Sequence, residues 1–218
     1  MKKITAFILA VLLTVPALAH AANYGIYVTP KIGGAIQSLD ANLSGLPGVS
    51  LDSNEGSFGG GLAVGYDFNT NYALPLRAEL EYMAWTSVDH TKHFADGFSG
   101  KAEVGIQSLF ANIYLDWHNS TNFTPYVGAG LGMGFVDTKG KVFTTLGDSA
   151  KFGSNMDTNF AWNVGLGCSY AFTDSISADL SYRYASFGDG KSSNLAGFHI
   201  NSNDNDMHQF LLGIRFTF

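Results

Sequence analysis

Three charged residues interrupt an otherwise apolar run at residues 74–85, which reads LPLRAELEYMAW. Arg77, Glu79 and Glu81 stand two residues apart, so in a strand all three lie on one face. A carboxylate beside a guanidinium can take part in proton transfer or form an ion pair. In a helix, Arg77 and Glu81 would also be neighbours, because they are four residues apart. Apolar residues occupy every second position of the run, and this alternation favours the strand.

Histidines and acidic residues in polar segments are the other groups suited to catalysis or metal binding. Five histidines follow the N-terminal segment: His90, His93, His118, His199 and His208. None of them lies in a recognisable nucleophile motif, so we predict that the chain is not an enzyme. The stretch NSNDND at residues 201–206 lacks the central glycine and the final glutamate of a calcium loop. We therefore predict no metal site and no cofactor.

The first 21 residues have the pattern of a secretory signal peptide. Lys2 and Lys3 precede an apolar stretch, and small residues stand at Ala19 and Ala21. The stretch is shorter than the ~20 apolar residues that a membrane-spanning helix needs. The sequence thus predicts a signal peptide at residues 1–21 and one domain at residues 22–218.

Composition narrows the class of that domain. The formal net charge of −6 argues against a nucleic-acid partner, which requires a basic surface. Charged residues make up 14% of the chain, well below the usual ~25%, while 26 glycines and 14% aromatic residues are present. Cys168 is the single cysteine, so no intrachain disulfide is expected. In an exported chain, a composition that is rich in glycine and aromatic residues and poor in charged residues indicates β-strands.

Eight segments alternate apolar residues with small or polar ones. They lie at about residues 24–38, 58–68, 74–85, 108–117, 125–136, 159–172, 176–184 and 209–218. The connections alternate between short ones and long polar ones, the latter at residues 39–57, 87–100, 137–157 and 188–206. We predict an all-β fold, an eight-stranded antiparallel up-and-down transmembrane β-barrel with short periplasmic turns and long extracellular loops. Val104 and Ile106 are out of phase with the fourth strand, which suggests a bulge or a segment above the apolar zone.

A soluble barrel with an apolar interior would show the same alternation. Two features favour the membrane. The non-apolar face consists mostly of small residues, which suit a crowded interior. Aromatic residues also end the apolar face near the short turns, as in an interfacial girdle: Tyr66, Phe68, Trp117, Tyr170, Phe172, Phe216 and Phe218.

If the apolar face of each strand meets lipid, seven charged residues point into the lumen: Lys31, Arg77, Glu79, Glu81, Asp179, Arg183 and Arg215. Asp179 and Arg215 are at matching depth on neighbouring strands and are expected to pair. Glu81 can reach Arg183 or Lys31. Side chains fill an eight-stranded barrel, so charges inside it must be paired. We expect an ionic plug, and the alternative is a gate or a narrow path for protons or ions.

Three stretches carry a resemblance to a known family: TPYVGAGLGMGF (124–135), NFAWNVGLGCSYAFTDSISADLSYRY (159–184) and FLLGIRFTF (210–218). The chain resembles the eight-stranded outer-membrane barrels of the opacity-protein and OmpA-like group. This resemblance implies a location in the cell outer membrane, among outer-membrane lipids and lipopolysaccharide. The ending, with Phe216 and Phe218, is similar to the signal read by the outer-membrane assembly machinery. No peptidoglycan-binding domain follows the last strand, so cell-wall tethering is not expected.

The sequence and the resemblance together predict a role in envelope integrity and in adhesin-like surface interaction. A surface ligand would bind through the long loops at 39–57, 87–100, 137–157 and 188–206. The alternatives are a narrow, low-conductance porin-like channel and, third, a lipid-modifying enzyme.

Overall fold

A computed structural model describes residues 24–44, 50–93, 98–144, 149–188, 190–191 and 199–218. The predicted signal peptide lies outside the described residues. Side chains are described for residues 24–37, 56–87, 105–135, 158–188 and 206–218. Within the described residues, no helix is both long enough and apolar enough to cross a membrane.

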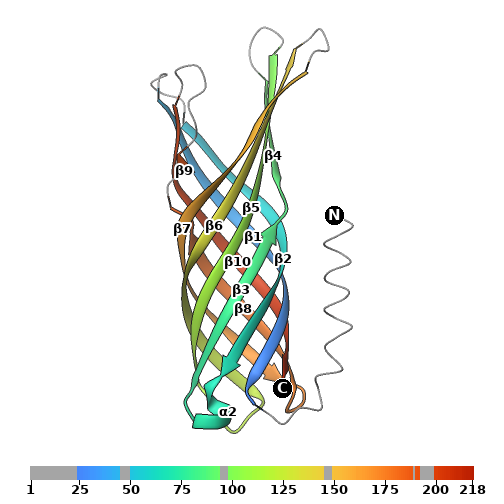
Figure 1. The fold of residues 1–218 in the computed structure, drawn as a ribbon, viewed down its shortest axis with the longest axis vertical. Coiled ribbons are helices and arrows are strands. Elements are labelled where there is room, and N and C mark those ends of the chain that lie inside the picture. Colours follow the sequence, from blue (N-terminus) through green and yellow to red (C-terminus); the bar gives the residue numbers. More distant parts are fainter. Residues whose placement is uncertain (1–23, 45–49, 94–97, 145–148, 189, 192–198) are drawn as a thin grey trace.

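The chain forms a closed, all-antiparallel barrel (Figure 1). Its elements are β1 (Ile26–Ser44), β2 (Ser50–Asp67), α2 (Phe68–Tyr72), β3 (Leu76–Trp85), β4 (Val88–His93), β5 (Phe98–Asp116), β6 (Phe123–Thr144), β7 (Ser149–Ala171), β8 (Ile176–Ser186), β9 (Gly190–Lys191) and β10 (His199–Thr217). Eight of the strands form the wall in the order β1-β2-β3-β5-β6-β7-β8-β10, and β10 pairs with β1 to close it. The predicted fold class is confirmed.

The strands are longer than the sequence predicted, at one end of the barrel only. β1 pairs with β2 as far as Asn42–Ser50, and β6 pairs with β7 as far as Phe143–Ser149. Much of the predicted loops 39–57, 87–100, 137–157 and 188–206 is therefore strand. Most of these segments are polar, and a polar segment without sustained alternation is predicted to be a loop.

These extensions form two separate sheets. Pairing between β2 and β3 ends at Gly59–Trp85, and pairing between β7 and β8 ends at Trp162–Ser186. Above those points, β9, β10, β1 and β2 stay paired with one another, and so do β4, β5, β6 and β7. We call these two sheets the β1 arm and the β6 arm. Figure 1 shows them diverging above the barrel.

The predicted irregularity near Val104 and Ile106 is not a bulge. Pairing between β5 and β6 runs from Phe98 to Asp116 without a shift. Register shifts occur instead between Leu39 and Asp40 and between Thr138 and Gly140. Ile106 is 3% exposed, because it belongs to an apolar layer inside the lumen.

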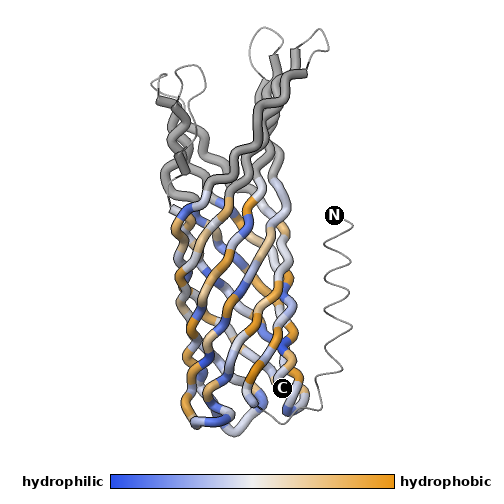
Figure 2. The backbone as a smooth tube through the Cα atoms, in the orientation of Figure 1, coloured by the Kyte–Doolittle hydropathy of each residue, from blue (hydrophilic) through white to orange (hydrophobic). Residues whose placement is uncertain are grey.

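Hydrophobic and hydrophilic residues alternate along the strands of the wall (Figure 2), and the apolar side chains face outward. Ile32, Phe58 and Leu131 are 63%, 76% and 61% exposed, which is the pattern of a lipid-facing surface. Trp117, Tyr170 and Phe172 of the predicted girdle are exposed as well.

Phe218 departs from the predicted girdle, because it is buried. Its N–H donates to the Ile26 carbonyl, and its own carbonyl accepts from the N–H groups of Tyr24 and Gly25 at 2.7 and 3.0 Å. These bonds hold the chain end in the seam between β10 and β1. Phe216, the other residue of the predicted assembly signal, is half-buried.

Candidate functional site in the barrel lumen

The structure places all seven predicted charged residues inside the barrel. They are at most 9% exposed: Lys31, Arg77, Glu79, Glu81, Asp179, Arg183 and Arg215. Strand alternation explains their common direction, since each lies on the face opposite the lipid-facing residues.

Lys31, Glu79, Glu81 and Arg183 form a central cluster. Lys31 Nζ lies 2.5 Å from Glu79 Oε1 and 2.6 Å from Glu81 Oε2. Arg183 Nη1 donates to Glu81 Oε1 at 2.6 Å, and Arg183 Nε donates to Gln209 at 2.7 Å. Glu81 thus contacts both of the partners that the sequence offered as alternatives.

Two further ion pairs lie nearer the short-turn end. Arg77 donates to both oxygens of Asp116, at 2.6 and 2.9 Å. Arg215 Nη2 lies 3.3 Å from Asp179 Oδ1 and donates to Ser169 at 2.6 Å. The expected contact between Asp179 and Arg215 is present, whereas Asp116 was not among the predicted site residues.

Tyrosines connect the charged groups. Tyr114 and Tyr27 donate to Glu79 at 3.1 and 3.3 Å. The Arg77 guanidinium lies 4.9 and 4.8 Å from the ring centroids of Tyr114 and Tyr126. A planar guanidinium stacked on aromatic rings is held by cation–π attraction as well as by its carboxylate. None of the three tyrosines stood out in the sequence, because all follow the same alternation as their neighbours.

The buried charges of the lumen balance among the residues whose side chains the structure describes. Four cations, Lys31, Arg77, Arg183 and Arg215, face four carboxylates, Glu79, Glu81, Asp116 and Asp179. Such pairing is the condition for placing charge in a low-dielectric interior. No group of three or more metal-ligating side chains occurs within the described part of the chain.

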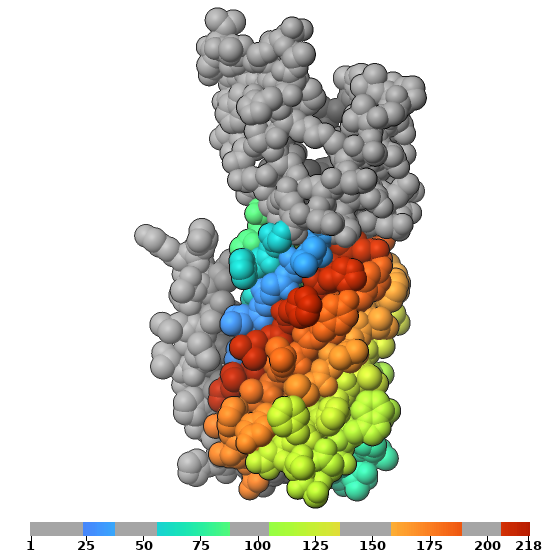
Figure 3. All heavy atoms as spheres, turned by 180° about the vertical axis from the view of Figure 1, so that it is seen from behind, coloured from blue at the N-terminus to red at the C-terminus, as the bar shows by residue number. Residues whose placement is uncertain are grey.

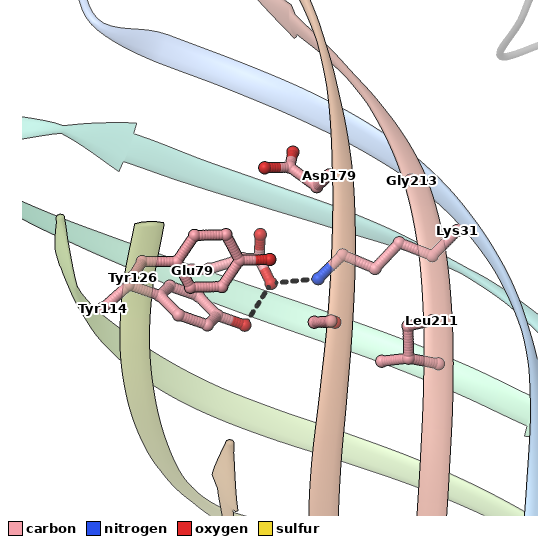
Figure 4. Close-up of a pocket in the computed structure, with 8 residues that line it drawn as sticks. Lys31, Glu79, Tyr114, Tyr126, Asp179, Leu211 and Gly213 are labelled. Atoms are coloured by element: carbon pink, nitrogen blue, oxygen red, sulfur yellow. Dashed lines mark hydrogen bonds and ion pairs between the residues drawn. The ribbon is translucent and has the colours of Figure 1, made fainter. Parts of the chain in front are cut away.

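A small cavity of about 20 Å³ separates the central cluster from the Asp179–Arg215 pair. Lys31, Glu79, Tyr114, Tyr126 and Asp179 line it, and Figure 4 shows their polar ends converging. Its size and polar lining suit an ordered water molecule.

An apolar layer lies in the lumen toward the arms. Its buried members are Ala35, Met83, Trp85, Ile106, Phe110, Ala161, Ala185, Phe187, Met207 and Leu211. The rings of Phe110 and Phe187 lie 6.0 Å apart, and both side chains are fully buried. The sequence signal for this layer was available, because Met83, Trp85 and Phe110 fall on the lumenal face at the arm-side ends of their strands.

Glycines on the lumenal face make room for these large side chains. A Cβ at Gly128 would lie 2.3 Å from Tyr114, and one at Gly134 would lie 2.5 Å from Phe187. A Cβ at Gly167 would lie 2.5 Å from Tyr126. The glycine alternation of β6 and β7 is therefore a packing requirement of the filled lumen.

The family profile described as "Outer membrane protein beta-barrel domain" matches residues 5–218. The chain belongs to this family. The barrel is therefore a protein of the outer membrane.

Two relatives match most of the barrel. Outer membrane protein PagN of Salmonella typhimurium is 33% identical over 219 residues, which cover 90% of this chain and 91% of that protein. A Rickettsia bellii protein that is named a candidate adhesin is 27% identical over 215 residues, covering 92% of this chain and 91% of its own. The solved structure of Neisserial surface protein A shares the fold, with a TM-score of 0.58 and 20% identity over 89% of this chain and 97% of its own.

The remaining candidate residues of the barrel lie apart from the lumen. His118 is exposed in the turn between β5 and β6, and His208 faces outward from β10. Cys168 is a free, half-buried cysteine. The side chains of His90, His93, His199 and residues 201–205 lie outside the described ones.

Proposed function

We propose that the barrel is a surface-display protein with an adhesin-like role, whose lumen is closed to ions. Its two arms carry the contacts with other surfaces, and its wall contributes to the integrity of the envelope. The observation that carries this proposal is the contrast between the two ends of the molecule. The lumen is filled with side chains, whereas the paired strands continue beyond it as two arms.

The contents of the lumen support closure. A balanced ion-pair network and an apolar layer lie one after the other along the barrel axis. An ion crossing the barrel would have to displace paired charges and then pass a layer in which apolar side chains predominate, and both steps are costly. Eight strands leave space for side chains and no wide channel.

The arms support display. A barrel that served only as a wall could end each hairpin at the edge of the apolar band. Here β5 and β6 remain paired to Phe98–Thr144, and β1 and β10 remain paired to Ser44–His199. The relative that is named a candidate adhesin matches 92% of this chain.

Adherence of bacteria that display the protein tests the proposal. The full chain is expressed in a non-adherent laboratory bacterium, and binding to cultured epithelial cells is counted. Replacing residues 42–50 by a two-residue Asn-Gly turn shortens the β1 arm, and the same change at 142–150 shortens the β6 arm. Shortening at least one arm should abolish binding, whereas Glu81→Gln, which alters only the lumen, should leave it unchanged. Adherence that survives the shortening of both arms would overturn the adhesin-like role.

A narrow, low-conductance pore is the second candidate, and the polar cavity between the ion clusters favours it. Recordings from planar bilayers containing the refolded protein separate the two functions. Envelope integrity is tested by comparing the detergent sensitivity of cells with and without the protein. Incubation with lipid A and mass-spectrometric analysis would reveal a lipid-modifying enzyme, which we do not expect.

A further inference from the structure

Three lysines occupy neighbouring register positions across the β6 arm. Lys101 of β5 is paired with Lys141 of β6, and Lys141 is paired with Lys151 of β7. Residues directly opposite one another in antiparallel strands share a face of the sheet, and neighbouring strands are about 5 Å apart. We call Lys101, Lys141 and Lys151 the lysine row. The arm thus places three like charges next to one another on one face.

The fold of the arm does not account for the lysine row. Like charges directly opposite one another destabilise a sheet. A lysine on an edge strand protects that edge from pairing with another chain, but β5 and β6 both lie inside the arm. On β4, the position opposite Lys101 is Thr91, and the next row toward the barrel contains Asp89, Glu103 and Lys139. Four lysines therefore stand against two carboxylates in these two rows, and the excess positive charge calls for an anion.

The lysine row belongs to the face of the arm that continues the outside of the wall. Leu131 and Met133 of β6 are exposed on the outside, and Lys141 follows them in the same alternation. The pairing of β5 with β6 shows no register shift between these positions, so the alternation is kept. Figure 3 shows the outside of the wall over β6, β7 and β8 as one convex surface. The molecules that surround this surface in the membrane are therefore the ones that meet the face of the row.

The height of the row above the apolar band indicates which part of a lipid it meets. Phe135 ends the outward apolar run of β6, and Asp137 follows it on the same face. Lys141 is six residues beyond Phe135, which in a tilted strand is a rise of about 15 Å. The headgroup layer of a phospholipid is only about 5–8 Å thick. A lipid must therefore carry a headgroup of several sugars to reach the row.

We propose that the lysine row binds phosphate groups on the headgroup of a glycolipid of the lipopolysaccharide type in the surrounding outer leaflet. Lysine ammonium groups bind phosphate as point charges, and three of them can hold more than one phosphate of the same headgroup. The acyl chains of that glycolipid lie against the apolar wall below the row. The β1 arm does not offer such a site, because Asp40 is paired with Asp52 there and two carboxylates repel a phosphate. The glycolipid is thus bound on one side of the protein.

Binding of lipopolysaccharide to the refolded protein in detergent micelles tests the site. The lipopolysaccharide carries a fluorophore on its core sugars, and fluorescence anisotropy gives the dissociation constant. Lys141→Gln should weaken binding about fivefold, the loss expected for one lysine beside an anionic lipid surface. Replacing all three lysines of the row by Gln should weaken it on the order of a hundredfold. Removing the phosphates of the lipopolysaccharide with hydrofluoric acid should weaken wild-type binding to a similar extent.

Lys92→Gln is the matched control. Lys92 of β4 belongs to the same arm, but it is paired with Gly100, the residue before Lys101, and so lies on the opposite face. Its replacement should leave the affinity unchanged, and heat-modifiable gel mobility verifies that each variant is folded. Full affinity in the triple variant, an equal loss in Lys92→Gln, or unchanged binding after phosphate removal would each overturn the proposal. Dextran sulfate that binds equally well with and without saturating lipopolysaccharide would also overturn it, because the row would then face a soluble polyanion.

Discussion

Arg183 and Glu81 form an ion pair that spans the lumen, with Nη1 donating to Oε1 at 2.6 Å. Their strands, β8 and β3, lie four places apart in the circuit of eight, so they belong to opposite walls. Glu81 also contacts Lys31 of β1. One carboxylate therefore joins three parts of the wall, and its loss affects all of them.

Glu81→Gln is expected to lower the free energy of unfolding by about 3–5 kcal/mol, because Arg183 then keeps a buried charge without a carboxylate partner. Urea unfolding in lipid vesicles measures this change. Asp174→Asn, in the exposed turn between β7 and β8, is the control and should change stability by no more than about 0.5 kcal/mol. Equal effects of the two substitutions would show that the network contributes nothing to stability.

Arg77 and Asp116 are expected to be energetically coupled, since two hydrogen bonds join them. A double-mutant cycle with Arg77→Gln and Asp116→Asn should give a coupling energy of about 0.5–3 kcal/mol. Asp116→Asn combined with Asp174→Asn is the reference cycle and should be additive. Additivity in both cycles would mean that the pair acts as two independent groups.

Gly134→Ala should destabilise the barrel by about 1–3 kcal/mol, because its Cβ would overlap Phe187 in a packed layer. Gly60→Ala is the contrasting change. The nearest atom to its Cβ is the Lys31 carbonyl oxygen at 3.7 Å, which is an ordinary contact. Thermal unfolding followed by gel mobility compares the two variants. A Gly134→Ala protein as stable as Gly60→Ala would contradict the packing account of the apolar layer.

Alternation in the sequence predicted the fold and the direction of each charged side chain. It did so because side chains of a strand point alternately to its two faces. In this barrel one face meets the membrane and the other meets the filled lumen, so the two faces need different residues. Depth counted from the short turns was enough to bring Asp179 and Arg215 together. The same counting placed Glu81 within reach of Arg183.

Contacts that depend on the tilt and stagger of the strands could not be predicted from the sequence. Asp116 lies on the lumenal face of β5, but nothing in the sequence showed that Arg77 would pair with it. The apolar layer was missed although Met83, Trp85 and Phe110 fall on the lumenal face. Phe110 of β5, Phe187 just after β8 and Met207 of β10 meet only when the barrel closes. The arms were missed because most of their sequence is polar, although Leu39, Ala41 and Leu43 alternate with polar residues in β1.

Single-channel recording from planar bilayers tests the central claim, a closed lumen, most directly. The refolded wild-type protein should show no steady ion steps. Since two barriers lie in series, Phe110→Ala with Phe187→Ala should stay silent, and so should Glu81→Gln with Arg183→Gln. Steady steps from the wild-type protein that disappear when Glu81 or Arg183 is changed would contradict the account, because the charge cluster would then conduct rather than close the lumen.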